Sequence, residues 1–254
     1  MTMIVSLVAR KGGVGKTSTA LNLAGAALDD GLKQVLLIDM DSQASLSKAV
    51  LGPSVVEGLR PDCTVQAVAE RTRSAGDVVR ETETPGVLVV PSHHDLRVPA
   101  DGALNLAGVS PDLILIDTPP DTRDTSVRCA LLASNVVISP VVPEPWGLQS
   151  VSGVQQLMMS AGIVSNQQLI FAGWLVSMIQ RLAMHNVCDD TLRRLHGATV
   201  YDATLPHAAA FKEAAAAGQP VTKTAPKSAA AKSVRAVWHE TLNRIEASVT
   251  RGAA

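Results

Sequence analysis

The chain has 254 residues, of which 46% are apolar and 18% charged, and its formal net charge is −1 at pH 7. This composition is typical of a folded globular chain and excludes disordered and collagen-like classes. No apolar run approaches the roughly 20 residues that cross a bilayer, so a membrane-embedded protein is also excluded. The three cysteines (Cys63, Cys129 and Cys188) are widely spaced with no C-x-x-C pair, which argues against a disulfide framework or a structural zinc site.

The length suits a single large domain, which we expect to span residues 1–254. The N-terminus lacks a basic leader and a small-residue cleavage site, so we expect a cytoplasmic protein. The small net charge hides an asymmetry: residues 1–180 carry 12 basic against 17 acidic side chains, and residues 181–254 carry 10 against 6. A basic C-terminal segment indicates a polyanionic partner, although solvated helices often have the same charge.

Short apolar runs alternate with helical patterns along the whole chain. Strands are predicted at Met3–Ala9, Val35–Asp39, Val87–Pro91, Leu113–Asp117, Val136–Pro140 and Leu169–Met178. Helices are predicted at about Lys16–Leu28, Val65–Val79, Thr125–Ala133, Gln149–Ser160, Asn186–Leu195, Ala208–Ala217 and Ser228–Ser248. The strands are apolar at successive positions, as in strands covered on both faces. The order predicts the α/β class, with a twisted, mostly parallel sheet and helices on both faces.

The first predicted strand and helix are joined by a glycine-rich segment, RKGGVGKTS, at residues 10–18. Its glycines let backbone N–H groups approach phosphate oxygens, and the helix that follows points its positive dipole end at the same place. In such a loop Lys16 reaches the β and γ phosphates, and the Thr17 hydroxyl ligates Mg²⁺. The segment predicts a site for ATP and Mg²⁺ that includes Lys11, Gly12, Gly13, Val14, Gly15, Lys16, Thr17 and Ser18.

Two acidic motifs follow predicted strands. VLLIDMDSQ (residues 35–43) places Asp39 and Asp41 at the carboxyl end of one strand, and LILIDTPP (residues 113–120) places Asp117 at the end of another. The carboxyl ends of the strands form the usual ligand edge of an open α/β sheet. We therefore expect the three carboxylates near the bound nucleotide, where Asp39 can contribute to the metal shell.

In this order and spacing, the three motifs resemble the ParA/MinD superfamily of P-loop ATPases. The loop has the superfamily's deviant form, K-G-G-x-G-K-[ST], with Arg10 where the general phosphate loop has glycine. The resemblance implies that Lys11 reaches across a homodimer to the partner's nucleotide and that Asp41 orients the attacking water. It also implies that Asp117 contacts Mg²⁺ through water. The expected catalytic residues are thus Lys11, Lys16 and Asp41, and the expected metal residues are Thr17, Asp39 and Asp117.

The C-terminal part resembles the ParA partition branch. Residues 203–206 (ATLP) and the following E-A and G-x-P pairs are similar to that branch's I-P-x(6)-E-A-x(3)-G-x-P stretch, which implies that the backbone after Pro206 lies beside the adenine. The branch binds nonspecific DNA as an ATP dimer, through phosphate contacts without base reading. The family's DNA-facing residues fall in this region, so the candidates are Lys212, Lys223, Lys227, Lys232 and Arg235. The sequence departs from the family at residues 207–210 (HAAA), where arginines are frequent.

The resemblance further implies a nucleoid-associated switch whose hydrolysis is stimulated by a ParB-like or other adaptor protein. Two alternatives stay open: an ATPase of the same branch that positions a protein cargo, and an ATP-dependent metabolic ligase of the same fold. The C-terminal segment lacks a basic amphipathic pattern with large apolar residues, so membrane binding is not expected. The chain begins directly with a strand, so we expect no N-terminal helix-turn-helix domain. His93, His94 and Asp95 are read as a loop, because adjacent side chains diverge.

Overall fold

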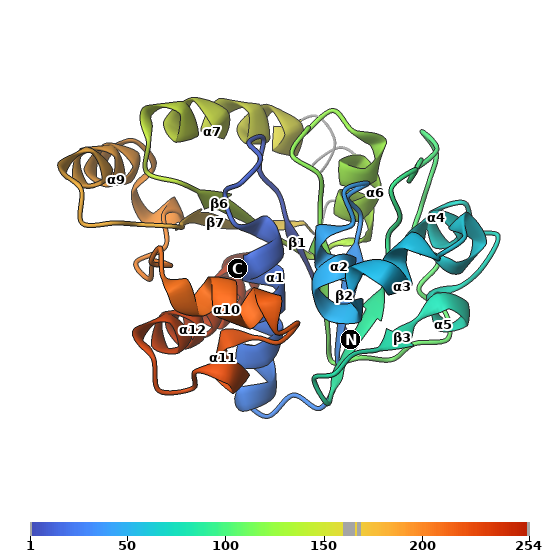
Figure 1. Cartoon of the computed structure of the whole chain (residues 1–254). Coiled ribbons are helices and arrows are strands. Elements are labelled where there is room, and N and C mark those ends of the chain that lie inside the picture. The colour runs from blue at the N-terminus through green and yellow to red at the C-terminus, as the bar shows by residue number, and fades with distance from the viewer. Residues whose placement is uncertain (1, 160–165, 167–168, 253–254) are drawn as a thin grey trace.

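The computed structural model describes residues 2–159, 166 and 169–252 and contains one central sheet (Figure 1). Over these residues the sheet has seven strands in the order β3-β4-β2-β5-β1-β6-β7, and all neighbours are parallel except β3 and β4. The strands are β1 (Met3–Leu7), β2 (Val35–Asp39), β3 (Arg80–Glu81), β4 (Val87–Val90), β5 (Leu113–Asp117), β6 (Val136–Val141) and β7 (Ile170–Val176). The α/β class with a mostly parallel sheet, predicted from the sequence, is confirmed.

Helices cover both faces of the sheet. One face carries α1 (Lys16–Asp29), α10 (Ala209–Ala216), α11 (Val221–Thr224) and α12 (Ala229–Gly252), which share one apolar cluster. The opposite face carries α4 (Val65–Ala69), α5 (Ala75–Val78), α6 (Thr125–Ala133), α7 (Pro145–Leu157) and α9 (Ala183–His196). The remaining short helices are α2 (Ser45–Leu51), α3 (Pro53–Glu57), η1 (Pro61–Cys63) and η3 (Gly197–Thr199).

Strand β2 shows why the apolar runs are unbroken. Val35 and Leu37 belong to the cluster around α1 and α12, whereas Leu36 and Ile38 belong to the cluster around α4 and α6. Successive side chains of a strand point to opposite faces, so a strand covered on both faces must be apolar at every position. All five residues of β2 are buried, as are all five of β5.

The predicted helix Val65–Val79 is wrong. The chain forms α4, leaves the helix through Arg71 in a left-handed conformation (φ 59°), and starts again at α5. The N–H groups of Thr72 and Arg73 both donate to the carbonyl of Ala67, which closes the end of α4. Ser74 then begins α5 with a capping box, in which its hydroxyl and backbone N–H both contact Asp77.

The other predicted elements are found with small changes at their ends, and six short elements were missed. Helix α7 begins at Pro145, earlier than the expected Gln149, and the expected end at Ser160 lies outside the described residues. The missed elements are α2, α3, α11, β3, η1 and η3, none longer than seven residues. Within the described parts of the chain, no helix is both long and apolar enough to cross a membrane.

Candidate nucleotide site

The glycine-rich loop lies between the end of β1 and the start of α1, as the sequence predicted. Gly13 (φ 73°) and Gly15 (φ 87°) adopt left-handed conformations that residues with a Cβ rarely adopt, and Gly15 is the N-cap residue directly before α1. The loop is anchored from β7, because the Ser177 hydroxyl donates to the Val14 carbonyl at 2.7 Å. The glycine-rich loop thus leads directly into the N-terminal end of α1, which is the arrangement that binds phosphate.

The carboxylates gather at the ligand edge of the sheet. Asp39 and Asp117 are register partners on the neighbouring strands β2 and β5. The Thr17 hydroxyl donates to Asp117 Oδ2 at 2.6 Å, while Asp117 Oδ1 is buried without a hydrogen-bond partner. Burial, helped by the nearby Asp39 carboxylate, raises the pKa of Asp117 to about 8, against the lowering effect of the Thr17 hydrogen bond. Burial lowers the pKa of Lys16, and the charges of Asp117 and Asp41 oppose that shift.

Asp117, Thr17 and Lys16 fit a site for Mg²⁺ and a nucleoside triphosphate. An unpartnered carboxylate oxygen and a threonine hydroxyl are oxygen ligands of the kind Mg²⁺ prefers, and Mg²⁺ often reaches its carboxylates through water. When bound, the metal supplies charge that neutralises the phosphate oxygens during phosphoryl transfer. Lys16, 7% exposed, adds a second positive charge at the start of α1.

Asp39 faces the protein rather than the loop. Its Oδ2 accepts hydrogen bonds from the Ser47 hydroxyl (2.7 Å) and the Ser47 N–H (2.8 Å), and its Oδ1 accepts one from the Asp41 N–H (3.1 Å). Burial raises the pKa of Asp39 to about 6, against the lowering effect of those hydrogen bonds. Both oxygens are thus engaged by α2 and by the backbone of residue 41, so the metal role expected for Asp39 stays a prediction.

An apolar cavity of about 190 Å³ opens beside the loop. Its lining includes Gly15 and Ser18 of the loop and α1, and its apolar walls are Met178, Leu205, Pro206, Ala208, Phe211 and Ala215. A flat, largely apolar purine base suits such walls. The cavity therefore provides a place for the adenine beside Pro206, the position that the sequence resemblance implied.

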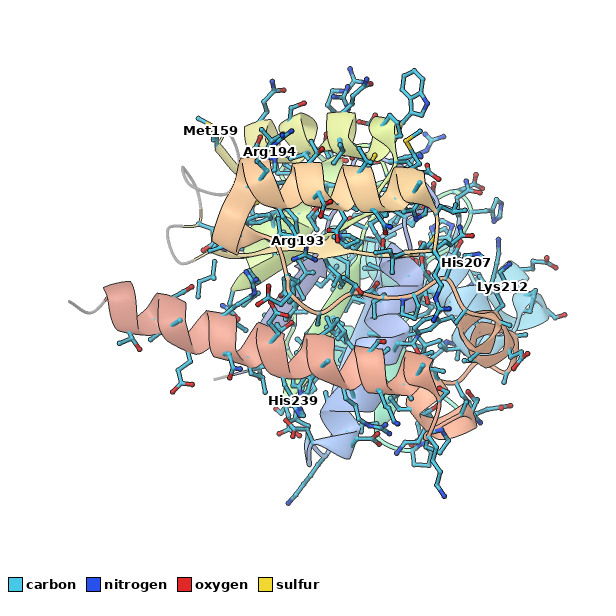
Figure 2. The ribbon with its side chains drawn as sticks, turned by 90° about the vertical axis from the view of Figure 1, so that its left-hand side faces the viewer. Met159, Arg193, Arg194, His207, Lys212 and His239 are labelled. Carbon is cyan, nitrogen blue, oxygen red and sulfur yellow. The ribbon has the colours of Figure 1, made fainter. Side chains whose placement is uncertain are left out.

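Lys212 lies at this cavity, together with His207. Figure 2 shows the two labelled side chains near each other at one edge of the molecule, away from His239 on α12. The sequence had assigned Lys212 to DNA. In the structure Lys212 lines the apolar cavity beside the glycine-rich loop, so a DNA contact has less support for Lys212 than for the lysines around the start of α12.

The second loop lysine points elsewhere. Lys11 Nζ forms an ion pair with Glu144 Oε2 at 3.2 Å, and both side chains are more than a third exposed. Glu144 directly precedes α7. The Arg10 side chain packs closely against the same helix at Gly153, where an added Cβ would lie 2.5 Å from the Arg10 Cδ. Lys11 and Lys16 thus have different surroundings: α7 for the first, the carboxylates for the second.

The remaining DNA candidates fall into two groups. Lys223 Nζ lies 3.1 Å from Asp29 Oδ1, and Arg235 Nη2 lies 2.6 Å from Asp29 Oδ2, so one carboxylate at the end of α1 forms ion pairs with both cations. Lys227 and Lys232 are exposed, and within the described part of the chain no carboxylate comes within ion-pair distance of either. These two lysines are the best placed for a phosphate backbone.

Sequence reasoning gave no role to several residues at the site. These residues are Glu144, which pairs with Lys11, and Ser47 and Ser92, which contact the Asp39–Asp41 segment. Lys11 and Glu144 are 133 positions apart and Ser47 and Ser92 are 45 apart, so no local spacing predicts these contacts. His93 is buried with hydrogen bonds to Gln66 and Asp95, which agrees with a structural loop. Among the residues with described positions, no cluster of His, Cys, Asp and Glu could hold a metal by itself.

The sheet architecture and the glycine-rich loop define the protein class: a P-loop ATPase whose loop carries the additional lysine, Lys11, of the deviant form. The family model described as "AAA domain" matches residues 2–170. The chromosome-partitioning ATPase Soj of Thermus thermophilus is 28% identical over 95% of this chain and 96% of its own. The chain belongs to the ParA/MinD superfamily, in its ParA-like branch, and is an ATPase by that membership.

Two solved structures share the fold. A plasmid partition protein of Borrelia burgdorferi bound to AMPPNP has a TM-score of 0.75 and 20% identity, and the match covers 98% of this chain and 100% of that one. The cobyrinic acid a,c-diamide synthase of Mycobacterium smegmatis, with a bound ATP analogue and magnesium, has a TM-score of 0.73 and 21% identity, with 92% of each chain covered. At these identities the likeness concerns the fold alone.

Proposed function

We propose that this ATPase, as one domain over residues 1–254, forms an ATP-bound homodimer, binds DNA without sequence preference and leaves it after hydrolysis. In doing so it would segregate or position a plasmid, a chromosome or another cargo. The observation that carries the proposal is the separate placement of the two loop lysines. Lys16 lies among the carboxylates of its own site, whereas Lys11 is half-exposed against Glu144 and is free to serve a second nucleotide once that pair opens.

Within the site, each residue has a distinct task in this proposal. The loop amides and Lys16 hold the phosphates, Thr17 and Asp117 hold Mg²⁺, and Asp41 orients the attacking water. Phosphoryl transfer asks mainly for positioning and charge neutralisation, so this set is sufficient. A partner's Lys11 would add positive charge only in the dimer, which would make hydrolysis depend on assembly.

The DNA part of the proposal is supported by the C-terminal charge. Lys227 and Lys232 lie at the start of α12, exposed and unpaired among the described residues, on a segment whose net charge is positive. Nonspecific DNA binding needs only such phosphate contacts. Such a protein would associate with the nucleoid, and an adaptor protein would stimulate its ATP hydrolysis. The adaptor need not bind DNA if the cargo is a protein assembly.

A metabolic ligase is the second candidate. It is favoured by one observation: the M. smegmatis synthase has the same fold over 92% of this chain. A ligase would need a substrate pocket beside the phosphates. The cavity found at the site is apolar and only about 190 Å³, which is small for a nucleotide base and a second substrate together.

The decisive experiment is binding to an unrelated DNA duplex with MgATP, with MgADP and without nucleotide, over a range of salt concentrations. We expect tight binding with MgATP only, which weakens as salt rises. Equal binding in all three states would contradict an ATP-gated switch. An absence of binding in every state, together with ATP consumption that requires a small-molecule substrate, would favour the ligase.

A further inference from the structure

The backbone of Asp41 is held from two sides by buried side chains. Its N–H donates to Asp39 Oδ1 at 3.1 Å, and its carbonyl accepts the Ser92 hydroxyl at 2.8 Å. The carboxylate itself is partly exposed at the ligand edge, where its Oδ1 accepts the Gln43 N–H at 2.9 Å. Residue 41 thus has a fixed backbone and an accessible side chain.

The two holding groups are joined through a third. Ser47, at the first turn of α2, donates its hydroxyl proton to Asp39 Oδ2 at 2.7 Å, and its oxygen accepts the Ser92 N–H at 2.9 Å. Asp39, Ser47 and Ser92 are all 0% exposed. Because a carbonyl and a carboxylate oxygen can only accept, the Ser92 hydroxyl donates to the Asp41 carbonyl and the Ser47 hydroxyl donates to Asp39.

The segment after Asp41 is a tight turn that needs outside support. The Ala44 N–H returns to the Asp41 carbonyl at 2.9 Å, and Ala44 has a left-handed backbone (φ 51°). A non-glycine residue in that region costs free energy and persists only where surrounding contacts hold it. Ser92 ties this turn to the end of β4, and Ser47 ties it to α2.

We propose that Ser92, directly through the Asp41 carbonyl, and Ser47, through Asp39, form a positioning relay that fixes the Asp41 backbone so that its carboxylate meets the attacking water. The inference rests on the proposed role of Asp41 and adds two positioning residues to it. Neither serine touches the nucleotide; each acts by limiting where residue 41 can be. Displacement of a catalytic group by about 1 Å can slow a reaction by about 100-fold.

The test compares Ser92→Ala with Ser134→Ala in the full chain. Ser134 is also a buried serine with hydrogen bonds to a second serine (Ser6, 2.6 Å) and to a helix carbonyl (Ala130, 2.8 Å), but it lies at the end of α6 and makes no contact with the Asp39–Asp41 segment. Hydrolysis is followed under single-turnover conditions with MgATP, and ATP affinity and thermal unfolding are measured on the same samples.

For Ser92→Ala we expect hydrolysis to fall by about 10-fold or more, with an ATP Kd within about twofold of wild type. Ser134→Ala should hydrolyse ATP at the wild-type rate even though it also loses buried hydrogen bonds. Ser92→Thr, which keeps the hydroxyl, should be faster than Ser92→Ala. Wild-type hydrolysis by Ser92→Ala would overturn the relay, as would equal losses in Ser92→Ala and Ser134→Ala, because those would report only general stability.

A third variant separates this inference from the proposed function. Asp41→Ala alone tests the role of Asp41: undiminished hydrolysis there removes that role, and the relay with it. If Asp41→Ala stops hydrolysis and Ser92→Ala does not slow it, the proposed function stands and the relay fails. If both act as expected, the double variant should be no slower than Asp41→Ala, because the relay has nothing left to position.

Discussion

At the scale of single residues, Lys16 is the side chain on which nucleotide binding depends most. It is nearly buried at the start of α1, between the phosphate loop and the carboxylates Asp117 and Asp41. We expect Lys16→Ala to weaken MgATP binding by about 100-fold or more, since a buried charge-assisted contact to phosphate is lost. Calorimetric titration with a non-hydrolysable ATP analogue measures this. Near wild-type affinity would mean that the phosphates lie elsewhere.

Asp117 should make the nucleotide-free protein less stable as pH rises. Its pKa is about 8 in the folded protein and about 4 in the unfolded chain, so between these values the native state binds more protons. Stability then falls as pH rises through that window. Asp117→Asn cannot ionise, so its unfolding temperature should exceed that of wild type by more at pH 8 than at pH 5. Asp101→Asn, at an exposed position, is the control. A gain independent of pH would contradict this account.

Glu144 should restrain Lys11 before the dimer forms. Because the pair is partly exposed, its strength is modest, but it occupies the lysine that is proposed to reach the partner. Glu144→Gln should shift the monomer–dimer equilibrium toward dimer in the presence of the ATP analogue, and Lys11→Ala should shift it toward monomer. Sedimentation velocity at several protein concentrations distinguishes the two. Equal behaviour of Glu144→Gln and wild type would show that the pair does not compete with assembly.

At the scale of elements, the prediction from sequence succeeded where a continuous apolar pattern determines the element. It failed where contacts with residues distant in sequence determine it. The strands β2 and β5 have their predicted bounds, because burial on both faces leaves a continuous apolar signal. The helix expected over 65–79 is interrupted because Arg71 turns left-handed and the following segment packs on residues 105–107, which no local pattern reveals.

The same distinction applies within the site. Lys16, Thr17 and Asp117 were identified because motif order and strand–helix context place them at one sheet edge. Glu144 and Ser92 were not, because their roles depend on side-chain contacts over 133 and 51 positions of sequence. Motif order thus finds the groups proposed to contact the nucleotide, and three-dimensional contacts are needed to find the residues that position those groups.

The end of α1 should regulate how strongly α11 and α12 attract DNA. Asp29 forms ion pairs with both Lys223 and Arg235, so Asp29→Asn would leave these two cations without their carboxylate partner, close in sequence to Lys227 and Lys232. We expect several-fold tighter DNA binding in MgATP and a steeper salt dependence. Asp101→Asn makes the same change in net charge elsewhere and should leave DNA binding unchanged. Fluorescence anisotropy with a labelled duplex measures both, and equal effects of the two variants would show that only net charge matters.

At the scale of the whole molecule, the proposed cycle requires that the DNA surface and the ATP site be separable by mutation. Lys227 and Lys232 lie around the start of α12, outside the cavity and the carboxylate cluster. The Lys227→Ala/Lys232→Ala variant should therefore bind MgATP and dimerise like wild type. With two lysines lost from each protomer, the slope of log K against log salt for DNA should fall by about 3 to 4, since each phosphate contact contributes about 0.9.

The outcome of that measurement decides between two possible DNA-binding surfaces on this fold. A reduced slope with unchanged ATP binding would place the DNA contacts around the start of α12. ATP would then act by bringing two protomers, each with a weakly basic surface, together in one dimer. An unchanged slope would move the contacts away from α12, with Lys212 at the mouth of the base cavity as the next residue to test. In that arrangement the nucleotide would control a DNA contact directly, because the same lysine would lie beside the base and the phosphate backbone.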